Sequence, residues 1–438
     1  MKILLVRATQ KYAYNDILSH LPINFPSRMY FHHKALTLPI LAALTPREHT
    51  IEVAEGEVKD INFDRHYDLV AISSLTRNAL RGYAIADEFR RRGVTVVLGG
   101  YHYSALPEEA KQHADAVVIG EAEETWPQLL KDFQHGELKP FYIPTRPVDP
   151  SLIPHPRFDI FPKHTGFGLQ ATRGCPYGCE FCSITNMKFR NVFRMKPIDV
   201  VMDELQALPN KTFFLIDNSI TLDPAYYKEL FRKMKSLNKK FIGYTNIDLF
   251  SQDEEFLKLT REAGGTIWMI GFESISQKTL DGVGKKTNRV DEYISAIKKI
   301  HDYGMLIFGL FCFGFDTDTL DIFDKTDEFL SKSDIDAGYF HTLSPEPGTP
   351  IYKKLDREGR ILTKDWSRYS RADCVVFQPK NMTPEQLLNK TYELRDKQYS
   401  ISNCFRRALI ARKMGTYAFL ESTWVNFKMR SDIHAFAP

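Results

Sequence analysis

The sequence lacks any apolar run close to the ~18 residues that a membrane-spanning helix requires. Its first residues, MKILLVRATQKYAYND, lack the apolar core and the cleavage site of a secretory signal. An excess of one charge is also missing, because 58 Lys and Arg stand against 55 Asp and Glu, a net of +3. This balance gives no reason to expect nucleic acid as a partner. We therefore expect a cytoplasmic protein without a nucleic-acid partner.

Cysteine is scarce, with six residues among 438, and three of the six lie within eight positions. In a chain without a secretion signal, this clustering favours a metal or redox site over disulfides. Cys312, Cys374 and Cys404 are scattered and form no second cluster motif. We expect them to be buried thiols, with Cys312 on a predicted strand that could face the active site. The length predicts two or three domains, and an apolar fraction of 43% supplies their cores.

The first third of the chain alternates short β-branched runs with helical periodicity. Near-continuous apolar strands between helices indicate a parallel sheet that is covered on both faces. The fold class is thus α/β, beginning with a doubly wound, Rossmann-like domain that binds ligands beyond the carboxyl ends of its strands. The predicted strands are 2–7, 50–53, 68–73, 95–98 and 116–119, and the predicted helices are 38–44, 78–92 and 123–133.

Further along the chain, seven prolines between 138 and 163 indicate an extended connector. Six strand–helix units follow, which predict a partial (β/α)6 barrel with function at the carboxyl ends of its strands. After about residue 366 the pattern becomes helical and more basic. The predicted division is 1–137 for the first domain, 138–165 for the connector, 166–365 for the barrel and 366–438 for a helical extension.

Cys175, Cys179 and Cys182 form a C-x3-C-x2-C run directly after a predicted strand. Three thiolates on one loop can hold three irons of a cubic cluster, and the fourth iron is left for a small molecule. Zinc would require a fourth Cys or His at suitable spacing, and His164 does not provide it. Inert thiols are the remaining alternative. Gly174 and Gly178 permit tight turns around a bulky inorganic group, so we favour the iron–sulfur cluster.

In this stretch the sequence resembles the radical S-adenosylmethionine (SAM) superfamily, from about residue 166 to 350. The resemblance implies that the three cysteines ligate a [4Fe–4S] cluster, whose open iron chelates SAM, and that Phe181 lies near the adenine. One-electron reduction by an external flavodoxin or ferredoxin then yields a 5′-deoxyadenosyl radical. Residues at the ends of later strands are implied in SAM binding: Asp217, Asn218, Thr245, Gly271, Glu273, Ser274 and Gly309.

The first domain resembles the cobalamin-binding domains that are fused to radical SAM enzymes. The resemblance implies a cobalamin pocket made by Ser73, Ser74, Thr76, Gly99, Gly100, Tyr101, His102, Gly120 and Glu121. The Asp-x-His-x-x-Gly signature of cobalt-ligating domains is absent, since the first loop reads ATQKYAYN. A histidine bond to cobalt from that loop is therefore excluded. A domain that keeps the fold without cobalamin remains open.

The combined resemblance implies methylation of an unactivated carbon in a small-molecule or lipid-like substrate. The adenosyl radical removes hydrogen from the substrate, and methylcobalamin then donates its methyl group. One alternative is ring formation, rearrangement or carbon–carbon coupling, and another is a cobalamin carrier or redox sensor. No catalytic acid or base is assigned. The basic tail at 405–415 and 424–429 predicts amphipathic helices that pack on the barrel or contact a membrane surface.

Overall fold

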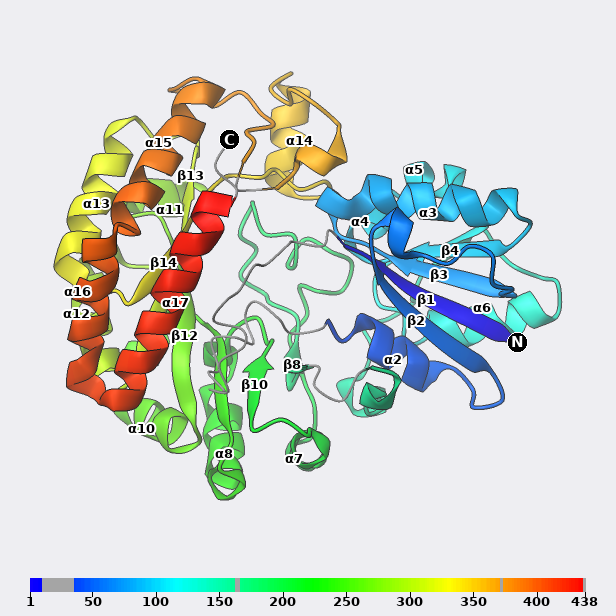
Figure 1. The fold of residues 1–438 in the computed structure, drawn as a ribbon, viewed down its shortest axis with the longest axis horizontal. Coiled ribbons are helices and arrows are strands. Elements are labelled where there is room, and N and C mark those ends of the chain that lie inside the picture. The colour runs from blue at the N-terminus through cyan, green and yellow to red at the C-terminus, as the bar shows by residue number, and fades with distance from the viewer. Residues whose placement is uncertain (10–34, 162–165, 371–372, 436–438) are drawn as a thin grey trace.

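A computed structural model describes residues 1–9, 35–161, 166–370 and 373–435. The chain forms two six-stranded parallel sheets that face each other, followed by a group of helices (Figure 1). These sheets confirm the predicted α/β class. The loop that was expected to lack a cobalt ligand lies mostly outside the described residues. Within these ranges, no helix has both the length and the apolar character needed to cross a membrane.

The first sheet has the strand order β2-β1-β3-β4-β5-β6, the flavodoxin-like doubly wound order. Its strands are β1 (Lys2–Ala8), β2 (Thr50–Gly56), β3 (Leu69–Ser73), β4 (Thr95–Gly99), β5 (Ala116–Val118) and β6 (Phe141–Tyr142). Its helices are α2 (Thr37–Leu44), α3 (Ala79–Arg91), α4 (Tyr101–Ala105), α5 (Pro107–Gln112) and α6 (Thr125–Gln134). Strand β6 lies inside the proline-rich segment. Helices α4 and α5 were not predicted, because five or six residues are too few to show helical periodicity.

The second sheet has the sequential order β7-β10-β11-β12-β13-β14 of a partial barrel. Its strands are β7 (Gly168–Leu169), β10 (Thr212–Leu215), β11 (Lys240–Thr245), β12 (Gly265–Glu273), β13 (Leu306–Phe313) and β14 (Ala337–Thr342). Helices α7 (Ile198–Ala207), α8 (Pro224–Met234), α9 (Ile247–Gln252), α10 (Glu254–Glu262), α11 (Gln277–Gly282), α12 (Tyr293–Asp302), α13 (Asp321–Ser333) and α14 (Pro350–Arg357) follow its strands. The predicted strand at 167–172 is interrupted, because Thr172–Arg173 (β8) instead pairs antiparallel with Arg194–Met195 (β9).

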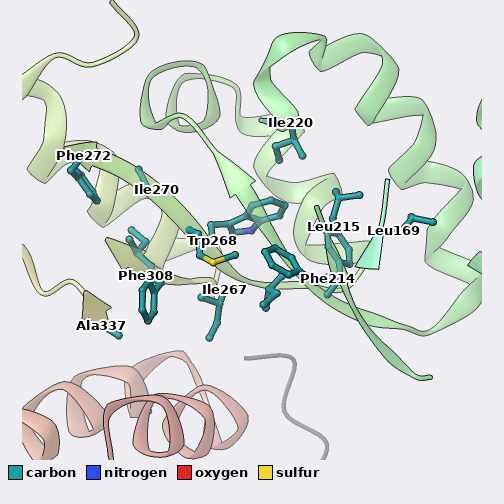
Figure 2. Packing of buried hydrophobic residues seen from close by; sticks show 14 of the residues in the cluster. Leu169, Phe214, Leu215, Ile220, Ile267, Trp268, Ile270, Phe272, Phe308 and Ala337 are labelled. Atoms are coloured by element: carbon teal, nitrogen blue, oxygen red, sulfur yellow. The ribbon is translucent and has the colours of Figure 1, made fainter. Parts of the chain in front are cut away.

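Aromatic and aliphatic side chains fill the core of the second sheet (Figure 2). Trp268 on β12 is fully buried and meets Phe241 edge-on with ring centroids 5.9 Å apart. Its indole nitrogen lies 3.2 Å from the Met305 sulfur. The buried rings fix the curvature of the sheet, because a close-packed core tolerates few alternative arrangements.

The carboxyl-terminal helices cover the free edge of β14. They are α15 (Pro384–Gln398), α16 (Ile401–Ala411) and α17 (Thr416–Ala435), and the 3₁₀ turn η10 (Arg412–Met414) joins the last two. The Tyr399 hydroxyl accepts from Gly338 N at 2.9 Å, and Arg395 Nε donates to Phe340 O at 2.7 Å. Side chains thus satisfy backbone groups that the next strand of a closed barrel would pair.

Candidate active site

A cavity of about 1480 Å³ lies where the two sheets and the carboxyl-terminal helices meet. The first sheet contributes the carboxyl ends of its strands, which is where parallel α/β sheets bind ligands. The second sheet contributes Phe214, Tyr244, Tyr339 and Phe340, and the carboxyl-terminal helices contribute Tyr392, Arg395, Tyr399, Met429, Asp432 and Ile433. A group bound on the first sheet therefore faces the inside of the partial barrel.

Most of the residues predicted to bind cobalamin line this cavity: Ser73, Ser74, Gly99, Gly100, Tyr101, Gly120 and Glu121. Gly100 has φ +97°, and a Cβ there would lie 2.7 Å from Ser73 Oγ, so only glycine fits at this strand end. The Tyr101 hydroxyl donates to Pro347 O at 2.7 Å, in the turn after β14. This hydrogen bond links the first sheet to the barrel at the rim of the cavity.

Two residues of the predicted cobalamin set, His102 and Thr76, do not line the cavity. The side chain of His102, on α4, is fully buried, and its Nε2 lies 3.3 Å from Glu109 Oε1. Its ring packs against Trp366, which also donates to Glu109 at 2.8 Å. His102 thus lies in the packed interior and not on the cavity lining, and its contact with cobalamin stays a prediction.

The cysteine loop runs from β8 to β9 and is held by its own backbone and by two polar side chains. Cys175 N donates to Arg190 O at 2.8 Å, and Thr185 Oγ1 donates to Cys175 O at 2.8 Å. Asn186 Nδ2 donates to Cys179 O at 3.2 Å and to Cys182 O at 2.7 Å. No sequence signal had singled out Thr185 or Asn186, because Thr and Asn in a loop serve many turns. Together these bonds place all three thiols on one preformed loop.

A charged group lies behind the middle cysteine. Burial raises the pKa of Cys179 to about 11, and the nearby Lys285 ammonium opposes that rise. Lys285 is itself buried and donates to Asn246 Oδ1 at 3.1 Å. Glu273 ends β12 with φ +61°, and a Cβ on Gly271 would lie 2.4 Å from its Oε1 and 3.6 Å from Lys285 Nζ. Asn238 and Asp334 share this backbone region at helix ends, and the contact of Glu273 with SAM stays a prediction.

The other residues predicted to bind SAM lie around the cysteine loop and the ends of the barrel strands. The Phe181 ring meets Phe315 edge-on at 5.5 Å, just after β13. Thr245 ends β11, and Ser274 follows β12 with its Oγ accepting from Ser276 N at 3.1 Å. Gly309 on β13 is close to the Phe311 and Phe272 rings. Asn218 is half-buried directly after β10. Their predicted contacts with SAM remain predictions.

The Asp217 carboxyl bonds to backbone amides and to a tyrosine of the protein itself. Its side chain is 1% exposed, and Oδ1 accepts from Ala171 N and Thr172 N, both at 2.9 Å. Its Oδ2 lies 2.7 Å from the Tyr227 hydroxyl. Burial raises the pKa of this carboxyl to about 7. These internal bonds hold the start of β8 onto β10, and the expected contact of Asp217 with SAM stays a prediction.

An ion network joins the first sheet to the cysteine loop. Glu121, which is 3% exposed and follows β5, pairs with Arg194 at 2.7 Å and with Arg190 at 3.1 Å. Arg173 lies 3.6 Å from Glu121 and 2.6 Å from Glu123. Burial alone would raise the pKa of Glu121, but the three arginines outweigh it and lower the pKa. The carboxylate expected to meet cobalamin therefore binds arginines, and Arg173 and Arg190 also line the cavity.

Comparisons with known proteins agree with this two-part arrangement. The model of the B12 binding domain matches residues 44–130, and that of the Radical SAM superfamily matches residues 169–330. Two relatives come from Chlorobaculum tepidum. Bacteriochlorophyllide d C-12(1)-methyltransferase is 31% identical over 354 residues, or 78% of this chain and 76% of the relative. Bacteriochlorophyllide d C-8(2)-methyltransferase is 32% identical over 366 residues, which cover 78% of this chain and 80% of the relative.

Among solved structures, the radical SAM methyltransferase TsrM from Kitasatospora setae matches with a TM-score of 0.69. It covers 100% of this chain and 99% of its own at 16% identity, so the likeness concerns the fold. Fold and site define an enzyme class in which an open α/β sheet and a partial barrel enclose one cavity, with Met187 and Arg190 of the cysteine loop on its lining and the three cysteines outside it. The chain belongs to the family of cobalamin-dependent radical SAM methyltransferases.

The cofactors are accordingly a [4Fe–4S] cluster, SAM and cobalamin. The residues present fit these groups. Three cysteines on one loop supply the ligand types and number of a cubic cluster with one open iron, although among the described residues their thiols do not yet converge as a metal-binding group. The glycine-lined strand ends under the cavity let a large planar group approach the backbone.

The cysteine assignment predicts the loss of the cluster in Cys179→Ala. We expect iron to fall from about four per chain to near zero, because a cubic cluster held by three thiolates does not survive the loss of one. Production of 5′-deoxyadenosine should disappear as well. Cys374→Ala, which removes a thiol almost 200 positions after the loop, serves as the control. Iron content and 5′-deoxyadenosine retained in Cys179→Ala would refute the assignment.

The structural role of Asp217 predicts that Asp217→Asn keeps its stability and its SAM cleavage, because an amide can make the same three contacts. Asp217→Ala should lose about 1–3 kcal/mol of unfolding free energy for each donor left unsatisfied. In the folded wild type the pKa of this carboxyl is about 7, against a usual pKa of 3.8, so the group is protonated below about pH 7. Unfolding releases this proton between those values, so wild-type stability should fall relative to Asp217→Asn as the pH rises through that window. Chemical denaturation at several pH values measures the difference.

The ion network predicts that Glu121→Gln lowers the unfolding free energy by about 3 kcal/mol, because Arg190 and Arg194 lose their buried counter-charge while Arg173 keeps Glu123. Glu124→Gln, at an exposed position three residues later, should be neutral. Denaturant titration of both variants gives the comparison. Equal stability of the two would show that the network does not hold the domains together.

Proposed function

We propose that this enzyme methylates an unactivated carbon on the periphery of a chlorin-type tetrapyrrole. The observation that carries the proposal is the single cavity that the cobalamin-domain strand ends share with the barrel. Met187 and Arg190, on the loop that carries the three cysteines, also line this cavity. A radical source held by that loop and a methyl donor held at the strand ends can therefore act in turn on one carbon. Two relatives with more than 30% identity over most of the chain are methyltransferases of bacteriochlorophyllide d, which supports the choice of substrate.

The cavity suits a large flat molecule with polar edges. Phe214, Tyr244, Tyr339 and Phe340 line its barrel wall, and aromatic rings pack well against a planar macrocycle. Arg395, at the helical end, provides a buried cation held by Phe340 O. Charged side chains, among them Arg7, Arg77 and Asp373, also line the cavity and suit the polar edges of such a molecule.

When bound, the cluster supplies the electron that cleaves SAM, and cobalamin carries the methyl group. For each methyl group transferred, two molecules of SAM and two electrons are consumed. The products are the methylated substrate, 5′-deoxyadenosine, methionine and S-adenosylhomocysteine. The electrons come from an external one-electron reductant of the flavodoxin or ferredoxin type. The roles of Phe181, Glu273 and the strand-end residues in holding SAM belong to this proposal.

The test is an anaerobic reaction of the reconstituted full chain with SAM, a reductant and bacteriochlorophyllide d. We expect a singly methylated tetrapyrrole, with 5′-deoxyadenosine and S-adenosylhomocysteine formed in amounts equal to it. Mass spectrometry of all three products provides the measurement, and Cys179→Ala is the inactive control.

Other outcomes would replace the proposal. Tetrapyrrole-dependent 5′-deoxyadenosine without S-adenosylhomocysteine would indicate a radical reaction other than methylation. Neither product, from a protein that holds iron and cobalamin, would indicate a carrier or sensor. Basal 5′-deoxyadenosine that tetrapyrrole does not stimulate would indicate a different substrate.

A further inference from the structure

Helices α16 and α17 form a hairpin whose outer face is apolar. Ile401, Phe405 and Leu409 are 55%, 53% and 58% exposed, and their spacing of four residues places them in one row along α16. Leu420 on α17 is 40% exposed, and Phe427 meets Phe405 at 5.4 Å. We call these five residues the hairpin face. In Figure 1, α16 lies on the side of the barrel remote from the first sheet.

The chain segment that forms most of the hairpin carries basic residues only. Between Asp396 and Glu421 the chain has no acidic residue, but it has five basic ones. Of these, Arg407 is buried and bonded to Asn426, while Lys397 and Arg406 pair with Asp327 and Asp334. Arg412 and Lys413 are exposed in η10, at the turn of the hairpin. The face thus combines exposed apolar side chains with a positive end.

The second helix of the hairpin separates this face from the cavity. Trp424 and Val425 of α17 are buried, in keeping with the predicted helix at 424–429 that packs on the barrel. Met429, Asp432 and Ile433, near its end, line the cavity. The buried apolar residues of α17 therefore pack toward the barrel and the cavity. The hairpin face, which includes Leu420, remains open to an outside partner.

We propose that the hairpin face binds the surface of a membrane that contains anionic lipids. Phe405 and Leu409 enter the boundary between headgroups and acyl chains, and Arg412 and Lys413 contact the phosphates. Scattered exposed apolar residues are ordinary, but a continuous row beside a basic turn has the composition of an interfacial helix. The attraction of basic residues to an anionic surface adds to the apolar burial. This inference does not depend on which substrate is methylated.

Sedimentation of the reconstituted full chain with vesicles tests the proposal. Vesicles of phosphatidylglycerol and phosphatidylcholine in equal parts should bind at least about fivefold more protein than phosphatidylcholine alone. Phe405→Ser/Leu409→Ser should weaken binding to the mixed vesicles by about tenfold or more. Arg412→Ser/Lys413→Ser should remove the preference for anionic vesicles. Leu362→Ser, at an exposed leucine outside the hairpin, is the matched control and should bind as the wild type does.

Visible spectra and thermal midpoints of the variants establish that each is folded and loaded. Equal binding by wild type and Phe405→Ser/Leu409→Ser would overturn the proposal, as would equal binding to the two kinds of vesicle. Absence of binding would overturn it as well. If the wild type were then a dimer that Phe405→Ser dissociates, a second copy of the chain would be the occupant. Methylation in detergent, without vesicles, reports on the proposed function separately.

Discussion

A buried carboxylate connects the two halves of the active site. Glu121 lies just after β5 of the first sheet, and it pairs with Arg173 before the cysteines and with Arg190 and Arg194 after them. A buried ion group adds little net stability compared with an apolar contact, but breaking it is costly. The ion group therefore acts mainly on geometry. It holds the strand ends of the first sheet against the loop that carries the three cysteines. Catalysis that passes a methyl group between two cofactor sites depends on that fixed separation.

A second constraint is the open side of the barrel. A parallel sheet of six strands leaves an edge, and unpaired edge groups must be bonded. In this chain Tyr399 and Arg395 bond to β14, and α17 lies across the opening (Figure 1). The same helices supply part of the cavity wall. Closing the edge and shaping the substrate end of the cavity are thus achieved by one segment, which also presents the hairpin face outward.

The cysteine triplet and the small residues at strand ends were predictable because their chemistry is local. Three thiols within eight residues lie on one loop in any fold, and Gly100 sits at a strand end where a side chain does not fit. Polar residues with more than one plausible role were harder to place. Asp217 and Asn218 share the same motif, but Asp217 is buried against Tyr227 and serves the fold. His102 follows two glycines like a ligand, but it packs against Trp366, more than 250 residues away in sequence.

By itself the sequence determined the class of chemistry, the α/β alternation and the order of the two sheets, because residue type, spacing and periodicity are properties of neighbouring positions. Only the tertiary structure decided which polar groups face the cavity and which are bonded to other residues of the protein and so hold its segments in place. Contacts between distant segments pair Glu121 with Arg194 and place the Lys285 ammonium near Cys179. Such contacts also pack α17 against the second sheet. Such contacts depend on the packed arrangement of the whole chain, and no local pattern records them.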